Sequence, residues 1–488
     1  MVQVKACING SRQQRRRVAA AVPNGMLGGI ISAIQACRGD EQRTSFLSLP
    51  PFLLFLHQII SAHVHAYIQA MEKLQLDLAT SSDLIGVETK STGLFLRGKE
   101  PSKNHSSVFA LGDRINILKE IDQPSLIPHI AEANSQRYPY EVLFRSLHKL
   151  LMDTATSEYL FCDVFFGEES IFYEIFAGPF AVLDEHFNVA LSNCYDAIGL
   201  MLMICIVHQH QLVMFRQQIR CLDSYLDKVN ISLWTRFQLV FDMHVNSLRN
   251  ANIRSLWEDD VHLHYVIKSS VEFTSSLGHL NVEYGDGYNL LDQNIKTLRM
   301  AIDDLLVRLA KKFTKPKLQK AFLIQNYEMI IAILREGRTR GGLRKAHFEE
   351  VRTEKYFDEL RKSSTVAFIQ EILLEHFNDL IKFVESRGSE ESSFSAENPS
   401  VTDLEPLVHD VSSRWKAAIK LIEKDITASF SNFESGTRIV TLTLTELLRY
   451  YTMFRERVNK MEGGTALTSQ LVSTFTFLCE IRKYFITF

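Results

Sequence analysis

The sequence lacks the features of secreted, disulfide-rich or turn-rich proteins. Only seven of its 488 residues are cysteine, none forms a CxxC pair, and only 22 glycines and 11 prolines occur. Scattered, unpaired thiols are typical of a reducing compartment, in which cysteine behaves as a small apolar residue. So few glycines and prolines disfavour a turn-rich β protein or a long flexible linker.

Long apolar runs and a strong net charge are also missing. No run reaches the roughly 18 apolar residues needed to span a bilayer. The best stretch, AIGLMLMICIV at Ala197–Val207, lies between Asp196 and His208, and we expect it to form a buried helix. The formal charge of −3 gives no indication of a nucleic-acid partner.

The charge is nevertheless unevenly distributed. Residues 1–40 contain six Lys or Arg and one acid, a net charge of +5, so the remainder carries −3 − 5 = −8. A basic, acid-poor start is a feature of organelle transit peptides, but it also occurs in disordered segments. We expect residues 1–57 to be an atypical, disordered N-terminal segment, with import into an organelle as the alternative.

Apolar residues recur with helical spacing from residue 58 onward. Between Ile295 and Leu309 they follow steps of 3, 4, 3 and 4, the spacing of a seam between two packed helices. A second series predicts a helix that stops before Gly436 and has Trp415 in its core; the rival interpretation is an exposed anchor for a partner. That series consists of Trp415, Ile419, Ile422, Ile426, Phe430 and Phe433.

These patterns predict an all-α fold built from consecutive helical bundles. A glycine-containing turn at 282–289 would separate a helical region at 58–287 from a C-terminal bundle at 288–488. We also expect an exposed loop at 386–400 and a last helix near Ala466–Tyr484. No repeat of fixed period is evident.

The segment FLIQNYEMIIAIL at Phe322–Leu334 combines a dense apolar surface with a polar interruption, Gln325-Asn326-Tyr327. The preceding Pro316 suits the first turn of a helix. The three polar residues have no partner acid or base within their own turn, so a catalytic role is disfavoured. We expect Asn326 and Tyr327 to hydrogen-bond a neighbouring helix or loop, since an unpaired buried amide costs about 1–3 kcal/mol.

One stretch, WEDDVHLHY, contains several residues that could bind a metal ion. On a helix, however, its two histidines are two positions apart and point about 200° away from each other. The favoured interpretation is an acidic first turn followed by a packed helix. A metal-dependent hydrolase centred on Glu258–His264 remains the alternative function. The possible ligands are Glu258, Asp259, Asp260, His262 and His264.

Other patterns of this kind are weaker. The pairs His63/His65 and His208/His210 share the two-residue spacing, and no HExxH, GxSxG or GxxxxGK[ST] motif occurs. We therefore assign no catalytic, cofactor-binding or metal-binding residue, and we expect no enzymatic activity and no cofactor.

Several long segments together resemble one protein family. FLIQNYEMIIAIL is similar to the FLINNYDxxxxVL segment of the vacuolar protein sorting subunit fifty-two family, also called the suppressor-of-actin-mutations family. SSRWKAAIKLIEKDITASFSNFESGT resembles the C-terminal block of that family, and YPYEVLFRSLHKLLMDTATSEYLFCDVFFG and LWTRFQLVFDMHVNSLR resemble its middle blocks. The resemblance runs from about residue 61 to residue 488 and is nearest to plant members.

The resemblance implies a rod of helical bundles that is a subunit of the Golgi-associated retrograde protein complex. Such subunits tether endosome-derived vesicles to the trans-Golgi network on its cytosolic face. Sister subunits, Golgi SNAREs and a Rab-type or Arf-like GTPase are the implied partners. Residues 1–57 do not resemble the coiled-coil N-terminal region of the family, so we expect much of that region to be absent here and assembly to be affected.

Overall fold

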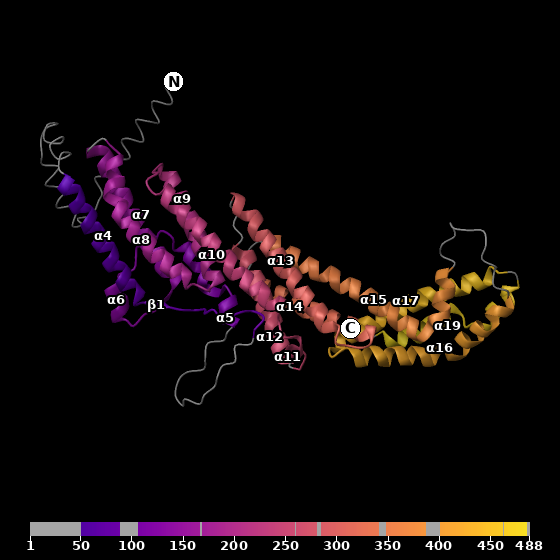
Figure 1. Ribbon diagram of the computed structural model, residues 1–488. Helices are drawn as coiled ribbons and strands as arrows, with labels where there is room; N and C mark the ends of the chain where they lie inside the picture. Colours follow the sequence, from indigo (N-terminus) through magenta and orange to yellow (C-terminus); the bar gives the residue numbers. More distant parts are fainter. Residues whose placement is uncertain are drawn as a thin grey trace, which may run out of the picture. The chain divides into compact units, whose positions relative to one another are not determined.

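The computed structural model of the protein consists almost entirely of helices, which confirms the all-α class (Figure 1). The structure describes residues 50–87, 106–165, 168–258, 260–280, 285–340, 348–386, 401–461 and 463–485. The chain divides into two compact units. Unit 1 contains Met1–Asn250 and Glu272–Leu298, and unit 2 contains Ala251–Val271 and Arg299–Phe488.

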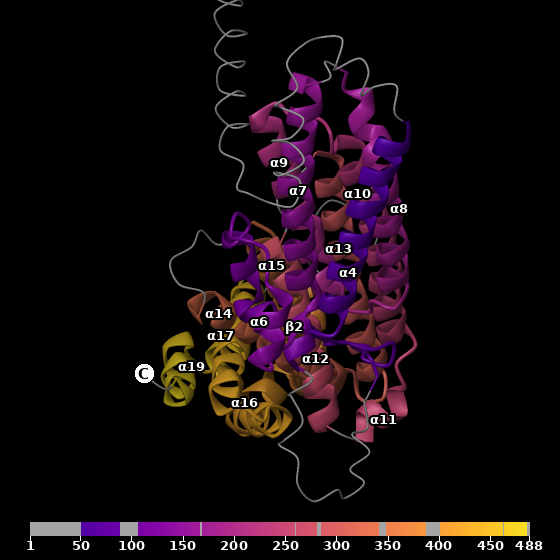
Figure 2. The same ribbon diagram turned by 90° about the vertical axis from the view of Figure 1, so that its left-hand side faces the viewer.

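Unit 1 is built around helices that run alongside one another (Figures 1 and 2). Helix α4 packs against α8, and α9 packs against both α10 and α7. A short 3-10 helix, η1, contacts α9. The bounds are α4 Pro50–Glu72, α5 Ser106–Phe109, η1 Gly112–Lys119, α6 Pro128–Ala133, α7 Tyr140–Phe165, α8 Ser170–Ser192, α9 Ala197–Gln217 and α10 Asp223–Arg249.

In unit 2, α14 packs along α15, and α17 packs against both α15 and α16. Two further helices, α12 (Asp260–Leu280) and α13 (Gly285–Ala310), have residues in both units. The remaining bounds are α11 Ile253–Glu258, α14 Pro316–Arg340, α15 Phe348–Ser386, α16 Val401–Ser429, α17 Phe433–Asn459, α18 Gly464–Gln470, α19 Thr474–Ile481 and η2 Arg482–Tyr484.

The predicted apolar seams are buried. Every seam residue from Ile295 to Leu309 is at most 2% exposed, and Ala197–Val207 is buried throughout within α9. Helix α9 is also the one helix, among the residues described, that is long and apolar enough to cross a membrane. Because 67% of its most apolar window is buried inside the protein, it is a core helix by packing.

Local sequence signals explain where several helices begin. Pro316 is the first residue of α14, as expected for a residue without an N–H to satisfy. The side chain of Asn432 accepts hydrogen bonds from the backbone N–H groups of residues 434 and 435 and so caps α17. Ser473 caps α19 and Asp196 caps α9 in the same way.

Some expected boundaries were wrong. Helix α4 already begins at Pro50, so residues 50–57 are helical, and Gly285 begins α13 inside the expected turn. Gly436 lies within α17, because the break between helices falls earlier, at Phe430–Asn432. The expected last helix is two helices, α18 and α19, separated by residues 471–473, of which Leu471 and Ser473 have extended backbones. The domain division at 287/288 stays a prediction, and residues 387–400 of the expected loop lie outside the described part.

A pair of two-residue strands was not expected from the sequence. Strand β1 (Gln75–Leu76) pairs in parallel with β2 (Tyr138–Pro139). A small apolar cluster that includes Met71, Leu74 and Leu143 lies beside the pair. This pairing joins the end of α4 to the start of α7. Such short strands carry too few residues to show a period of two.

Candidate functional site

The polar residues that interrupt the apolar surface of α14 contact other helices and turns of unit 2. Gln325 Oε1 accepts hydrogen bonds from the N–H and the hydroxyl of Ser431, at 3.1 and 2.7 Å. Its Nε2 donates to the carbonyl of Ser429 at 3.3 Å. One side chain thus satisfies three polar groups of the turn that links α16 to α17.

The expectation for Tyr327 is confirmed, and that for Asn326 is wrong. Tyr327 is 2% exposed and donates its hydroxyl proton to Asp303 Oδ1 on α13, at 2.5 Å. Burial raises the pKa of both groups. Asn326 instead donates to the carbonyl of Phe322 in its own helix, at 2.8 Å. The side chain that hydrogen-bonds the turn between α16 and α17 is that of the preceding residue, Gln325.

Glu328 of α14 contacts both α17 and α15. It accepts a hydrogen bond from Ser435 at 2.6 Å and forms an ion pair with Arg438, both on α17. Arg361 of α15 lies 3.8 Å from the same carboxylate. We call Gln325, Tyr327 and Glu328 the α14 polar stripe. Its members link α14 to α13, α15 and α17, which is a structural role.

A second polar cluster lies where α15 bends. The backbone of Phe377 is non-helical, with φ −134° and ψ 36°. Next to it, Lys317 of α14 contacts Glu375 at 2.6 Å and Asp425 of α16 at 3.2 Å, and His376 contacts Asp425 at 3.1 Å. Burial opposes ionisation of Asp425, but hydrogen bonds from His376 and Lys317 outweigh it and lower the pKa of this carboxyl.

A buried ion triad in unit 1 was missed by the sequence analysis. Arg114 of η1 contacts Glu141 of α7 at 2.8 Å and Asp196, which caps α9, at 2.5 Å. The three side chains are at most 14% exposed. A buried pair that loses one partner leaves an uncompensated charge, so the triad fixes η1 against both helices. Its residues are 27 and 82 positions apart, too far for any local pattern.

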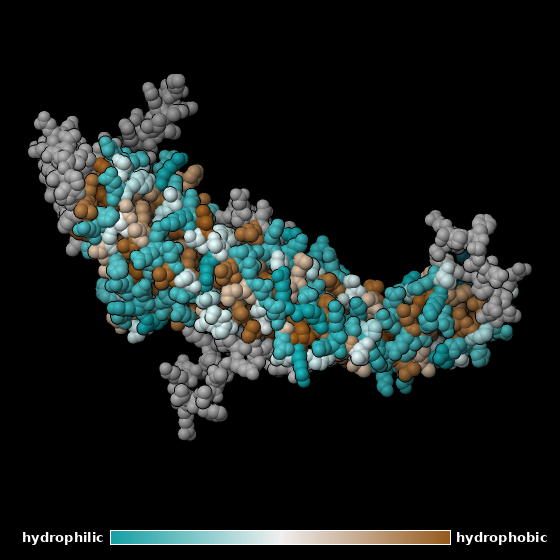
Figure 3. Space-filling view, in the orientation of Figure 1, coloured by the Kyte–Doolittle hydropathy of each residue, from teal (hydrophilic) through white to brown (hydrophobic). Residues whose placement is uncertain are grey.

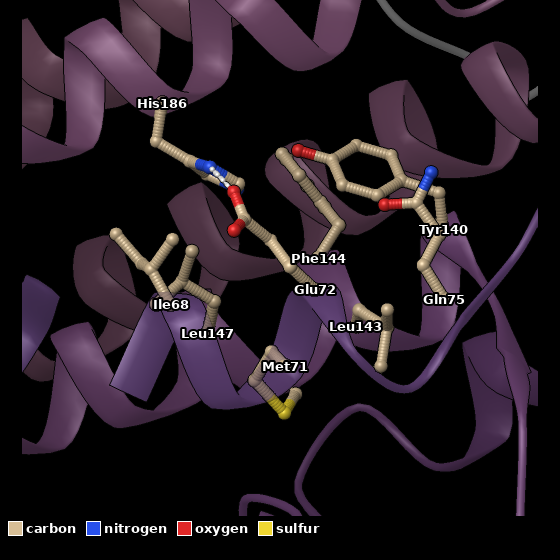
Figure 4. A pocket seen from close by; sticks show the side chains of 9 residues that line it. All are labelled: Ile68, Met71, Glu72, Gln75, Tyr140, Leu143, Phe144, Leu147 and His186. Atoms are coloured by element: carbon tan, nitrogen blue, oxygen red, sulfur yellow. Dashed lines mark ion pairs between the residues drawn. The ribbon is translucent and has the colours of Figure 1, made fainter. Parts of the chain in front are cut away.

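Unit 1 also has a small pocket between α4, α7 and α8 (Figure 4). Its cavity volume is about 10 Å³, room for about one water molecule. Apolar side chains line most of it, and an ion pair between Glu72 and His186, 3.2 Å apart, lies against it. The ring of Tyr140 also lines this space, and burial raises the pKa of its hydroxyl. The cavity is too small for a metabolite.

The histidines and acids considered as metal ligands either have side chains outside the described residues or form no group that could bind a metal ion. The side chains of Glu258–His264 lie outside the described residues; the backbone places His262 and His264 on α12. Elsewhere in the described part, no group of three or more His, Cys, Asp or Glu side chains could hold a metal ion. His63 and His65 are exposed on α4, and burial lowers the pKa of His208 and His210 on α9, to about 4 and about 3.

Trp415 lies in the core, as predicted. It is 5% exposed, and its ring stacks on Phe477 of α19 with 5.0 Å between ring centroids. Phe477 stacks in turn on Tyr451 of α17 at 4.1 Å. Phe433, predicted to share this core, is 67% exposed at the start of α17. The prediction for Phe433 failed because the helix ends at Ser429, so the helical period does not continue to residue 433.

Fold and side-chain contacts together define a helical protein whose polar residues join helices to one another. Comparison with known proteins agrees with this class: residues 55–358 match the family described as "Vps52, C-terminal". This match covers well over half of the chain. The protein therefore belongs to the Vps52 family.

Similar proteins extend the match towards the C-terminus. The chain is 62% identical over 434 residues to vacuolar protein sorting-associated protein 52 A of Arabidopsis thaliana, covering 89% of this chain and 60% of that protein. It is 60% identical, with the same coverage, to protein 52 B of the same plant. Identity to the Mus musculus homologue is 30% over 462 residues, with 91% and 62% coverage. The chain thus spans about three-fifths of the length of these relatives.

Proposed function

We propose that the protein is a non-enzymatic subunit of a vesicle-tethering complex, the Golgi-associated retrograde protein complex. It would act in retrograde transport from endosomes to the trans-Golgi network. The observation that carries this proposal is the family match over residues 55–358. Relatives named for vacuolar protein sorting, similar along about nine-tenths of the chain, support it further.

The proposed partners are sister subunits of that complex, Golgi SNAREs and a Rab-type or Arf-like GTPase. The proposed location is the cytosolic face of the trans-Golgi network and of endosomes, where the protein would associate with the membrane surface. No cofactor and no nucleic acid enters the proposal.

A scaffolding mechanism suits the helical architecture. Buried seams and polar contacts, such as that between Gln325 and Ser431, hold the helices of a unit in fixed register. Helices fixed in this way present binding surfaces at set positions. Two membranes bound by one assembly bring their SNAREs to a high effective concentration, without any bond-making side chain in the tether.

Co-purification with the sister subunits tests the proposal. We expect a tagged chain, extended at its N-terminus to the length of its relatives, to recover those subunits from cells. The same chain without the extension measures how far residues 1–488 suffice. An unrelated tagged helical protein of similar size serves as the control. Recovery of no sister subunit by the extended chain would refute the proposal.

Localisation provides a second, independent test. A fluorescent tag at the C-terminus should mark the trans-Golgi network and endosomes. A plastid or mitochondrial signal would instead support organelle import directed by the basic residues at 1–40, and would contradict the proposed location.

A further inference from the structure

The outer face of α16 carries three lysines that form no ion pair with a carboxylate in the described part of the chain. Lys416, Lys420 and Lys424 are four residues apart, a spacing that aligns side chains along one face of a helix. All three are exposed, and among the described residues their ammonium groups have no hydrogen bond or ion pair; Lys416 Nζ lies 5.3 Å from the centroid of the Trp415 ring. We call these residues the lysine ridge.

The opposite face of the same helix fixes the direction of the ridge. Ile419, Ile422 and Ile426 are fully buried in the core of unit 2. Because these residues face inwards, the lysines must face outwards. Buried Trp415 and Phe430 at either end hold this orientation.

Two acidic residues of α16 are already paired with groups outside the ridge. Asp410 pairs with Arg414, and Asp425 is engaged by Lys317 and His376 on the neighbouring helices. Some lysines elsewhere in the described residues do have a carboxylate partner: Lys362, for example, pairs with Asp358 at 2.7 Å. Glu423 lies beside the ridge on the same helix, but within the described residues no ion pair joins it to a lysine of the ridge. Three lysines next to one carboxylate leave the ridge with a net positive charge.

Small and apolar side chains accompany the lysines. Ser413, Ala417 and Ala428 are exposed on the outer face, and Leu421 is 51% exposed beside the ridge. The space-filling view shows hydrophilic and hydrophobic residues intermixed over the visible face of the protein (Figure 3). Small side chains allow a flat surface to approach closely, and an exposed leucine can enter the boundary of a lipid layer.

We propose that the lysine ridge of α16 binds the anionic phosphates of a phospholipid surface. Protein–protein interfaces are enriched in arginine and depleted of lysine, whereas the ridge contains lysine alone. Lysine is a compact, strongly hydrated point charge that needs no bidentate partner, which suits a layer of mobile headgroups. The occupant that fits the charge and shape best is thus an anionic membrane rather than an acidic protein.

The expected strength is modest. Each lysine near an anionic surface strengthens binding about fivefold, so three together contribute roughly a hundredfold. A contribution of this size assists an assembly held by other contacts and leaves the protein able to dissociate. The inference rests on the proposed function only for the identity of the membrane, that of the trans-Golgi network or of endosomes.

Vesicle co-sedimentation of the purified full chain tests the proposal. The vesicles are phosphatidylcholine alone, or phosphatidylcholine with about one-third phosphatidylserine. We expect binding to the anionic vesicles only, lost at about 0.5 M salt. The variant Lys416→Gln, Lys420→Gln, Lys424→Gln should bind them roughly a hundredfold more weakly.

A matched variant controls for net charge. Lys228→Gln, Lys355→Gln, Lys362→Gln also removes three exposed lysines, but each of these already has a carboxylate partner. It should bind like the wild type, and thermal melting should show that all three proteins are equally folded. Both variants retain the basic residues 1–40, so any contribution from that segment cancels.

Several outcomes would overturn the inference. Equal lipid binding by the ridge variant and the matched variant would do so, as would equal binding of the wild type to neutral vesicles. If the wild type ignores anionic vesicles, and the ridge variant loses a protein from the co-purified complex, the occupant is an acidic protein instead. Because the assay contains only lipid and this chain, failure to recover sister subunits would refute the proposed function and leave the inference standing.

Discussion

Replacing Trp415 with alanine should destabilise unit 2 strongly. The indole is 5% exposed and belongs to a continuous aromatic stack that joins three helices. Its ring packs on Phe477 of α19 at an interplanar angle of 24°, and Phe477 lies nearly parallel to Tyr451 of α17, at 9°. Removal of the indole therefore leaves a cavity at the junction of α16, α17 and α19.

The magnitude follows from this burial. Truncating a buried tryptophan to alanine costs about 3–5 kcal/mol, which includes the lost ring contacts. For a unit of roughly 200 residues, each kcal/mol lowers the melting temperature by about 2–4 °C. The expected decrease is thus roughly 6–20 °C. A loss of this size is a large fraction of the stability of an ordinary domain.

Thermal unfolding followed by circular dichroism measures the effect. Phe433→Ala is the matched control, because it removes a 67% exposed aromatic ring at the start of α17 and should leave stability within about 0.5 kcal/mol. Trp415→Phe, which keeps a ring in the stack, should fall between the wild type and Trp415→Ala. If Trp415→Ala melts like the wild type but no longer binds its partners, the residue belongs to an interface and the core assignment is wrong.

Two further predictions concern hydrogen bonds and pH. Gln325→Ala leaves the polar groups of Ser429 and Ser431 without their partner. The free energy of unfolding should therefore decrease by about 1–3 kcal/mol, and amide hydrogen exchange at residues 429–433 should become faster. Unchanged exchange at these residues would contradict the role of Gln325. Burial lowers the pKa of His148 and His244 to about 4, below the ordinary value of 6.5. The unfolded chain therefore takes up protons first, and the contribution of these histidines to the free energy of unfolding should be constant above pH 6.5 and fall between pH 6.5 and 4 in urea titrations. His244→Phe should flatten that fall, and an equally steep fall in this variant would count against the explanation.

Much of the helical fold could be predicted from local sequence. The seam from Ile295 to Leu309 and the series from Trp415 to Phe430 have a period of 3.6 residues, and each side chain faces the core as that period requires. Pro316 marked the first turn of α14 for a purely local reason, its missing N–H. The class of the protein likewise followed from long collinear segments.

The partners of polar residues could not be predicted in this way. Which amide of the QNY segment reaches another element depends on how α14 lies beside the α16–α17 turn, and only Gln325 reaches it. The triad of Arg114, Glu141 and Asp196 joins residues far apart in the chain. Local periodicity contains no information about such pairs, because the spacing of side chains along one helix is independent of the element packed against it.

The sequence by itself therefore determined the all-α class, the buried faces of the main helices and the family. Only the tertiary structure decided where helices stop, as at Ser429, and which charges have no partner among the described residues, as at Lys416, Lys420 and Lys424. The physical reason is the range of the interactions. Helical burial repeats every few residues along the chain, whereas helix ends and ion pairs depend on groups that distant segments bring into contact.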